Sequence, residues 1–259
     1  MTEPTEPQGR RLALSLPRCW INDLLYFSRD VPVVAGERTL RIRAVSEARS
    51  ALHKRPSWMS ILVKAIGITS MRVPELRRAY MPYPWPHFYE SPFSSAAIAM
   101  DRVYEGEHGT FVAPMPRPET TPLAKIHSRI HAWQTQPVEE TAAFRRLIRI
   151  SKLWMPIRRL LWGMGLYLIG KYRTQYFGTF SINSIAATRC RMLQFATPTT
   201  VVFYYGLATR GEMTLQIAFD HRVFDGYAAA RTMSELESIL NTEIVQELKQ
   251  PPASELLAA

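Results

Sequence analysis

Hydrophobic and polar residues follow one another along the first third of the chain in patterns that predict both helices and strands. Positions 12–28 predict a turn followed by a short helix, and alternation over 38–45 predicts a half-buried strand. Apolar residues recur at helical spacing over 58–69, and Pro74 follows that helix. The stretch 80–93 is rich in proline, which cannot donate ladder hydrogen bonds, so we expect it to be irregular.

The middle of the chain predicts two further strands and a helix. Residues 96–103 and 110–113 have the composition of strands, and we expect them to be joined across Gly106 and Gly109. The segment 123–133 has the spacing of a helix.

The pattern is clearest in the C-terminal third. A β-rich run at 200–207, a turn at 209–212 and a second run at 213–219 predict an antiparallel hairpin. A helix begins near Gly226, and one of its faces carries the apolar residues Ala229, Met233, Leu236 and Leu240.

Together these elements predict an α/β (α+β) fold in which helices cover one side of a mixed, largely antiparallel sheet. We expect one domain over 12–245, with a flexible lead at 1–11 and a tail at 246–259. The sequence shows no internal repeat and no linker long enough to divide the chain.

Composition narrows the class of protein. The hydrophobic share of 47% and the charged share of 21% are those of a globular protein. A net charge of +10 favours an anionic partner, which could be nucleic acid, an anionic membrane surface or a phosphorylated small molecule. No nucleic-acid-binding motif has recognisable spacing, so we expect no nucleic-acid partner.

Cysteine and histidine usage bears on compartment and metal content. The sequence has only two cysteines, Cys19 and Cys190, and its start does not resemble a secretory signal, so we expect a reducing, cytoplasmic location. No cluster of Cys, His and carboxylates has metal-ligand spacing, and we predict no metal site.

One motif carries chemistry: Phe-Asp-His-Arg-Val-Phe-Asp-Gly at 219–226, between the last strand and the last helix. A neutral imidazole at His221, with an ordinary pKa of ~6.5, can take a proton from a thiol, hydroxyl or amine. Asp225 can cap the helix or hold a cation, and Gly226 would supply backbone freedom. Alone, His-x-x-x-Asp-Gly is a weak signal, because a backbone-bonded histidine and a plain capping aspartate produce it too.

The surrounding residues make the motif more specific. The stretch 215–231 resembles the end of the catalytic domain of dihydrolipoamide acyltransferases, which belong to 2-oxo acid dehydrogenase complexes and are relatives of chloramphenicol acetyltransferase. Gly-Thr-Phe-Ser-Ile-Asn-Ser at 178–184 resembles that family's Gly-Thr-Phe-Thr-Ile-Ser-Asn strand. Arg-Pro-Ser at 55–57 and Val-Pro-Glu-Leu at 73–76 resemble the start and end of a family helix.

The resemblance implies a chloramphenicol acetyltransferase-like fold and a homotrimer with active sites at subunit interfaces. It also implies acyl transfer between a coenzyme A thioester and a thiol, amine or hydroxyl, with coenzyme A or acyl-CoA as a substrate. His221 would be the general base, and Arg222 and Gly226 complete the motif. Asp225 would hold the loop through a salt bridge, for which Arg18 and Arg222 are the candidate cations. The residues that bind coenzyme A are not assigned.

The family's oxyanion donor is a serine, and Asn183 stands at the matching position. An amide can donate to an oxyanion, so Asn183 is the third catalytic candidate. Ser184 points to the opposite face of the strand, whereas Ser181 shares the face of Asn183, and both are further candidate donors.

The chain departs from the family in two other respects. No lipoyl domain or Ala/Pro-rich linker precedes the core, so we expect no swinging-arm role. The segment 144–172 looks like an insertion in which basic and large apolar residues are interleaved, and its longest uncharged run is too short to span a bilayer. It fits membrane-surface or lipid contact, a hydrophobic lid over an acyl tunnel, or packing on the core or a neighbouring subunit.

Three functions are therefore open. The first is a coenzyme A-dependent acyltransferase, for which the apolar insertion favours a long or bulky acyl group over acetyl. The alternative is a non-catalytic trimeric scaffold or membrane-associated member of the same fold, suggested by the change to Asn183. The third is a small relative of peptide-condensing domains, which carry a similar His and Asp-Gly motif.

Overall fold

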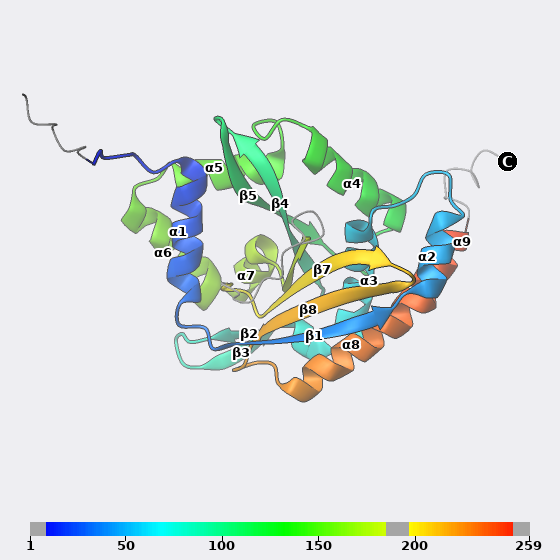
Figure 1. Cartoon of the computed structure of the whole chain (residues 1–259). Coiled ribbons are helices and arrows are strands. Elements are labelled where there is room, and N and C mark those ends of the chain that lie inside the picture. Colours follow the sequence, from blue (N-terminus) through cyan, green and yellow to red (C-terminus); the bar gives the residue numbers. More distant parts are fainter. Residues whose placement is uncertain (1–8, 185–196, 251–259) are drawn as a thin grey trace, which may run out of the picture.

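A computed structural model describes residues 9–184 and 197–250. Its centre is a six-stranded sheet in the order β1-β8-β7-β6-β4-β5, and β2 and β3 form a separate two-stranded sheet (Figure 1). The strands are β1 (Val33–Arg41), β2 (Arg78–Met81), β3 (His87–Glu90), β4 (Ser95–Tyr104), β5 (Glu107–Pro116), β6 (Phe180–Ser184), β7 (Val201–Thr209) and β8 (Glu212–Asp220).

Pairing in the large sheet is mixed and largely antiparallel, as the sequence predicts. β8 is antiparallel to β1 and β7, and β5 to β4, whereas β6 is parallel to both β7 and β4. The two hairpin turns have left-handed backbone, with φ values of 52° and 78° at Glu105 and Gly106 and of 52° and 79° at Arg210 and Gly211. Glycine adopts this conformation without steric cost, so it suits the second position of each tight turn.

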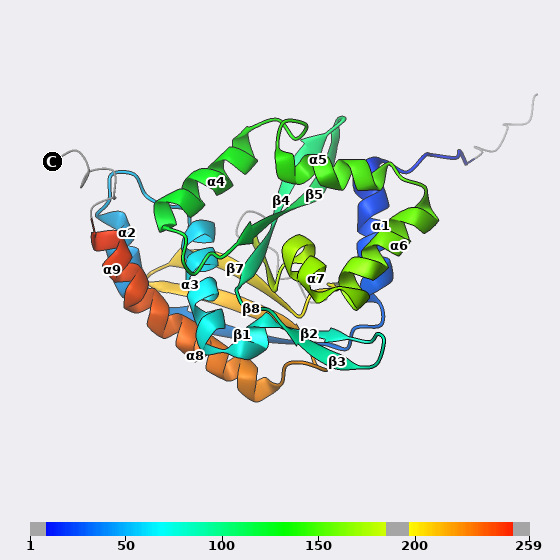
Figure 2. The same ribbon diagram turned by 180° about the vertical axis from the view of Figure 1, so that it is seen from behind.

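Helices lie on both faces of the sheet and not on one face only, which corrects the prediction (Figures 1 and 2). On the first face α3 packs between α4 and α8. On the second, α1, α5 and α7 contact β5, and α6 packs on α1. The helices are α1 (Leu16–Ser28), α2 (Arg43–Ser50), α3 (Trp58–Arg72), η1 (Pro74–Arg77), α4 (Leu123–Thr135), α5 (Ala142–Ser151), α6 (Met155–Gly163), the π-helix η2 (Met164–Leu168), α7 (Gly170–Phe177), α8 (Gly226–Asn241) and α9 (Glu243–Lys249).

The main hydrophobic core fills the first face. Alternate residues of each strand point into it, for example Ile98 of β4, Ile182 of β6 and Ile217 of β8, all nearly fully buried. A second, smaller cluster on the other face joins Trp20 and Phe27 of α1 to helix α6 and to η2.

The predicted strand at 38–45 is wrong at both ends. β1 begins earlier, at Val33, and ends at Arg41, and the next residues form α2. Leu40 and Ile42 alternate as in a strand, but the next buried apolar residue, Val45, comes three positions later, which is helical spacing.

Two further predictions need correction. The segment 80–93 contains strand residues of the β2–β3 hairpin, and its prolines at 82, 84 and 86 fall in the connection, where no ladder hydrogen bond is needed. Gly109 lies within β5 and does not join the strands. A Cβ added there would lie 2.6 Å from the Cβ of Pro17, so a small residue is required because α1 approaches closely.

The segment 144–172 runs through α5, α6, η2 and the start of α7. Among the described residues no helix is long and apolar enough to cross a membrane. At the other end of the chain, α9 continues beyond the expected domain end at 245 and buries Leu248.

Candidate acyl-transfer site

The motif loop is held at its start by a buried carboxylate. Asp220, the last residue of β8, is 1% exposed, and its carboxylate accepts hydrogen bonds from the backbone N–H of Arg222 at 3.0 Å and from its guanidinium at 2.9 and 2.7 Å. The Asp220 carbonyl accepts from the N–H groups of Val223 and Phe224. The Phe224 side chain is buried, so the loop is anchored at both ends.

His221 is exposed on this anchored loop. Its backbone N–H donates to the Pro32 carbonyl at 2.9 Å, and its ring lies edge-on to that of Phe219, with centroids 6.0 Å apart. The imidazole is therefore presented outward from a fixed backbone, which suits proton transfer to a bound molecule.

Two arginines surround Asp220. The guanidinium of Arg222 lies over the Tyr80 ring at 4.4 Å from its centroid. Burial opposes the charge of Arg222, but the hydrogen bonds to Asp220, the Asp220 charge and two nearby tyrosines together outweigh it and raise the pKa of Arg222. Arg173 is buried and donates to the carbonyls of Leu166 and Pro198. Burial lowers the pKa of Arg173 to about 10, although the charge of Asp220 acts in the opposite direction.

Asp225 caps helix α8 and, among the residues that the structure describes, pairs with neither expected cation. Its carboxylate accepts from the Ala228 N–H at 2.7 Å. The two candidate cations are paired elsewhere, Arg18 with Glu107 and Arg222 with Asp220.

Gly226 supplies no special backbone conformation. Its φ is not positive, and a Cβ added there would meet no atom within 4 Å. Backbone freedom therefore does not explain a glycine at this position, which corrects the prediction.

The three polar candidates of β6 have different surroundings. The Asn183 amide hydrogen-bonds the phenol of Tyr204, whose pKa burial raises in spite of this bond. Ser184 does the same for Tyr205 on the opposite face. Ser181 Oγ lies 3.1 Å from Thr199 Oγ1, which lies 2.7 Å from Thr197 Oγ1.

Ser181 lines a cavity of about 980 Å³ between the second face of the sheet and the helices. Its walls are mainly apolar and aromatic. The principal lining residues are Trp20 and Leu24 of α1, Ala97 of β4, Val112 and Pro114 of β5, Arg146, Leu147 and Ile150 of α5, Leu161 and Trp162 of α6, Lys171, Tyr172, Tyr176 and Phe177 of α7, Ser181 of β6, and Thr197 and Thr199 before β7.

Alternation along the strands explains where this space comes from. Ala97 and Ser181 are small and face the cavity, whereas their neighbours Ile98 and Ile182 are large and fill the core. Small side chains on one face of a sheet leave volume that the covering helices do not fill.

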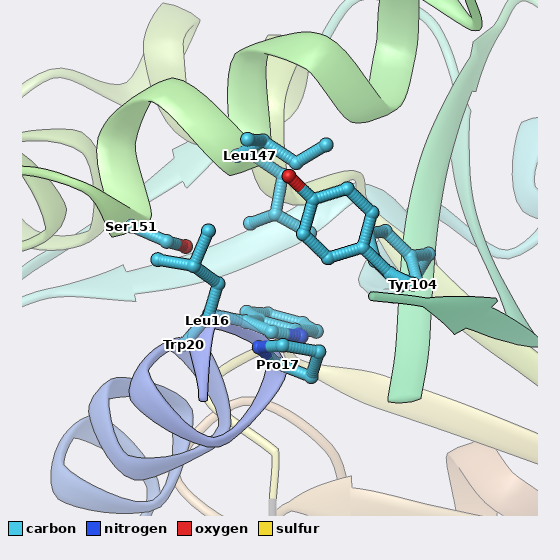
Figure 3. Close-up of a pocket in the computed structure, with 8 residues that line it drawn as sticks. Leu16, Pro17, Trp20, Tyr104, Leu147 and Ser151 are labelled. Atoms are coloured by element: carbon cyan, nitrogen blue, oxygen red, sulfur yellow. The ribbon is translucent and has the colours of Figure 1, made fainter. Parts of the chain in front are cut away.

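Packing is tight where α1 and α5 meet the end of the β4–β5 hairpin. The side chains drawn in Figure 3, among them Leu16, Pro17 and Tyr104, line a void of about 10 Å³, scarcely the space of one water molecule. Trp20 and Leu147 line both this void and the large cavity, so they form part of the wall between them.

The structure does not bring all the predicted residues together within one chain. His221 does not line the cavity, whereas Ser181 does. Sequence reasoning gave an acyl tunnel only as one alternative for the segment 144–172, and it missed Thr197 and Thr199 of the cavity wall and the buried Arg173 beside Asp220. The small residues at alternate positions of β4 and β6 were the available signal. Among the described residues no group of three or more His, Cys, Asp or Glu could hold a metal ion.

No protein-family model and no curated protein matches the chain. Solved structures do match. A dihydrolipoamide acetyltransferase of Azotobacter vinelandii is 14% identical, with a TM-score of 0.65 over 94% of this chain and 97% of that one. A probable dihydrolipoamide acetyltransferase of Listeria monocytogenes is 13% identical, with a TM-score of 0.62 and the same coverage. A chloramphenicol acetyltransferase is 12% identical, with a TM-score of 0.52 over 85% of this chain and 94% of its own. The chain therefore has the fold shared by dihydrolipoamide acetyltransferases and chloramphenicol acetyltransferase.

Proposed function

We propose that this protein is a coenzyme A-dependent acyltransferase with His221 as its general base. The observation that carries the proposal is the exposed imidazole of His221 on a loop fixed by buried Asp220 and Phe224. The similar Azotobacter enzyme was investigated for the catalytic role of a serine, a histidine and an asparagine, the last four residues after the histidine. Asp225 lies four residues after His221 in this chain.

The reaction we propose balances as follows. The acceptor X–H gives its proton to the His221 imidazole as X attacks the thioester carbonyl, and the carbonyl electron pair moves onto oxygen. When the tetrahedral intermediate collapses, the C–S bond breaks, and the departing thiolate takes the proton from the imidazolium. The products are the acylated acceptor and coenzyme A, and the histidine is regenerated.

Two groups of residues support this chemistry. Asp225 is a positioning residue, because it caps α8 and so fixes the end of the loop. The oxyanion donor would come from the face of β6 that carries Ser181 and Asn183. We favour Ser181, since Thr199 and Thr197 form a hydroxyl chain behind it and one orientation of that chain leaves the Ser181 O–H free to donate into the cavity.

We propose further that the protein is a homotrimer with active sites shared between copies. His221 lies outside the cavity of its own chain, so a complete site needs the histidine of one copy at the cavity of another. Mixing a His221→Ala protein with a Ser181→Ala protein during refolding should restore activity that neither has alone. Mixed protein no more active than the two parents would contradict shared sites.

The test of the proposed function is thiol release from acyl-CoA thioesters of increasing chain length, each offered with thiol, amine and hydroxyl acceptors. His221→Ala should lower the rate about 10²–10⁴-fold, the usual contribution of a general base. His108→Ala is the matched control, because His108 is exposed and pairs with Asp101 on the β4–β5 hairpin. Equal turnover in both variants would exclude His221 as the base, and no turnover with any pair would favour the second candidate.

That second candidate is a membrane-associated role, favoured by the outer surface of α6. Exposed apolar residues gather in the α6 segment: Leu153, Trp154, Met155, Ile157, Leu160 and Leu161. Residues 142–178 contain no Asp or Glu, and five of their basic residues are exposed: Arg145, Arg146, Arg149, Lys152 and Lys171. Like charge opposes pairing of this surface with itself, so an anionic bilayer is the complementary partner.

Sedimentation with vesicles tests the membrane role. Vesicles containing phosphatidylserine should carry the protein down, and vesicles of phosphatidylcholine alone should carry much less. Replacing Trp154 and Leu160 by serine should abolish the effect, whereas Leu207→Ser, at an exposed position of β7, should not. Binding that is independent of lipid charge, or that is unchanged by the double substitution in α6, would contradict the membrane role.

A further inference from the structure

The large cavity differs from the rest of the molecule in the chemistry of its wall. Among the described residues that line it, none is acidic, and most are apolar or aromatic. Its volume of about 980 Å³ is at the upper end of the ~300–1,000 Å³ found for small-molecule sites. Leu161 and Tyr172 line it and are each 42% exposed, so the space can be reached from outside.

Two cations belong to this wall, Arg146 of α5 and Lys171 of α7. The Arg146 guanidinium lies over the ring of Tyr176, 3.1 Å from its centroid, which holds it against the wall. Neither Arg146 nor Lys171 forms an ion pair with any residue in the described parts of the chain. Two cations without an acidic partner beside an apolar cavity attract an anion that is attached to an apolar body.

The hydroxyl groups supply the second polar feature. Ser181, Thr199 and Thr197 form a hydrogen-bonded chain in the wall contributed by β6 and the residues before β7. The cations, by contrast, lie on helices α5 and α7. A ligand that uses both features therefore has polar groups separated by hydrocarbon.

We propose that this cavity binds a long hydrocarbon chain that carries an anionic group. The chain lies against the aromatic and aliphatic wall, and the anionic group lies at Arg146 and Lys171. This inference rests on the proposed function in one respect: it makes such an amphiphile, and not a short acyl group, the substrate class of the acyl transfer. Binding itself is a separate property and can be measured without turnover.

Displacement of a fluorescent fatty acid by dodecanoate, dodecyl phosphate and dodecanol tests the proposal on the assembled full-length protein. The two anions should displace the probe at concentrations about tenfold lower than the neutral alcohol. Displacement by only one anion identifies the preferred head group, carboxylate or phosphate, and supports the proposal equally. Exclusion of every probe from the assembled protein, or equal affinity for dodecanol, overturns it.

Matched substitutions locate the site. Val112→Trp places a large ring in the cavity from strand β5 and should weaken dodecanoate binding at least about tenfold, whereas Val103→Trp, at an exposed position of β4, should not. Arg146→Gln should weaken the two anions about tenfold and leave dodecanol unchanged, with Arg145→Gln as its control. Loss of binding in Val103→Trp or none in Val112→Trp overturns the assignment.

The outcome is distinguishable from failure of the proposed function. A His221→Ala protein that binds dodecanoate normally but does not turn over supports both proposals. Turnover of acetyl-CoA with no binding of any long chain overturns this inference and leaves acyl transfer standing. Binding of dodecanoate by a protein without transferase activity overturns the proposed function alone.

Discussion

The two faces of the six-stranded sheet differ in what their side chains do. On the first face, Phe180, Ile182 and Ile98 pack into a continuous core with α3, α4 and α8. On the second face, Ser181 and Ala97 occupy the intervening positions and border a cavity of about 980 Å³. Burial of apolar area stabilises the fold at about 25 cal/mol per Å², so the first face provides most of the stability and the second gives up part of it.

A face that surrounds open space needs other means to hold its helices. Here a buried ion pair joins α1 to α6: Asp23 is fully buried, and both Arg158 and Arg159 pair with it. The aromatic rings of Trp20, Phe27 and Trp162 pack around the same junction. The difference between the faces teaches that the covering helices are fixed at a few points rather than over a whole surface, which leaves the cavity open between them.

Asp23→Ala should give the largest effect on stability. It leaves Arg158 buried without its carboxylate, which typically costs about 3–5 kcal/mol of unfolding free energy. Denaturant unfolding measures this, with Asp30→Ala as control, because Asp30 forms only an exposed pair with Arg29 and should lose less than about 1 kcal/mol. A similar, small loss of unfolding free energy in both variants would show that the second face does not depend on the buried ion pair of Asp23.

Neighbouring residues of β6 compare the two faces directly. Ile182→Ala should cost about 2–5 kcal/mol of unfolding free energy, because it opens a hole in the core. Ser181→Ala removes one hydrogen bond beside space that already exists and should cost about 0.5–1.5 kcal/mol, while activity falls if Ser181 is the oxyanion donor. Equal destabilisation by both substitutions would mean that the cavity face is packed as tightly as the core.

The sequence predicts the first face better than the second, for a physical reason. Core strands and α8 carry apolar residues at their structural period, so the pattern alone locates 200–207, 213–219 and the helix from Gly226. A cavity leaves no apolar period of its own. It forms only when Ala97 and Ser181 are brought to adjacent strands by the parallel pairing of β4 and β6.

Residues of the candidate site also differ in how well the sequence predicts them. The order Asp-His-Arg followed by Asp-Gly identified the motif loop, because its anchoring is local: Asp220 bonds Arg222 two residues on, and Asp225 bonds Ala228 three residues on. The buried Arg173 beside Asp220 is separated from it by almost fifty positions, and no local pattern indicates such a neighbour. The wrong expectation of a salt bridge at Asp225 has the same origin, since Arg18 lies in space beside Glu107.

The smallest predicted effect concerns pH and belongs to the first face alone. His127 of α4 accepts at Nδ1 from the Ser57 N–H at the start of α3, at 3.3 Å, and this requires the unprotonated ring. Burial, then the charges of His131 and Arg49, lowers the pKa of His127. In the unfolded chain the pKa of a histidine is ~6.5, so below that pH the folded state binds fewer protons than the unfolded state. The contribution of His127 to the unfolding free energy is therefore complete above pH ~6.5. It is lost as the pH falls toward the lower pKa of the folded state.

His127 lies at the α3–α4 junction on the core side of the sheet, and no histidine lines the described wall of the cavity. His127→Gln keeps a hydrogen-bond acceptor but does not titrate. Between pH 7 and pH 5.5 the unfolding free energy should therefore fall further in the parent protein than in His127→Gln. The difference should be below about 1 kcal/mol, the scale of one neutral hydrogen bond. An identical pH dependence in the two proteins would show that the titrating group does not lie at the α3–α4 junction. The contrast between the two faces would then be weaker.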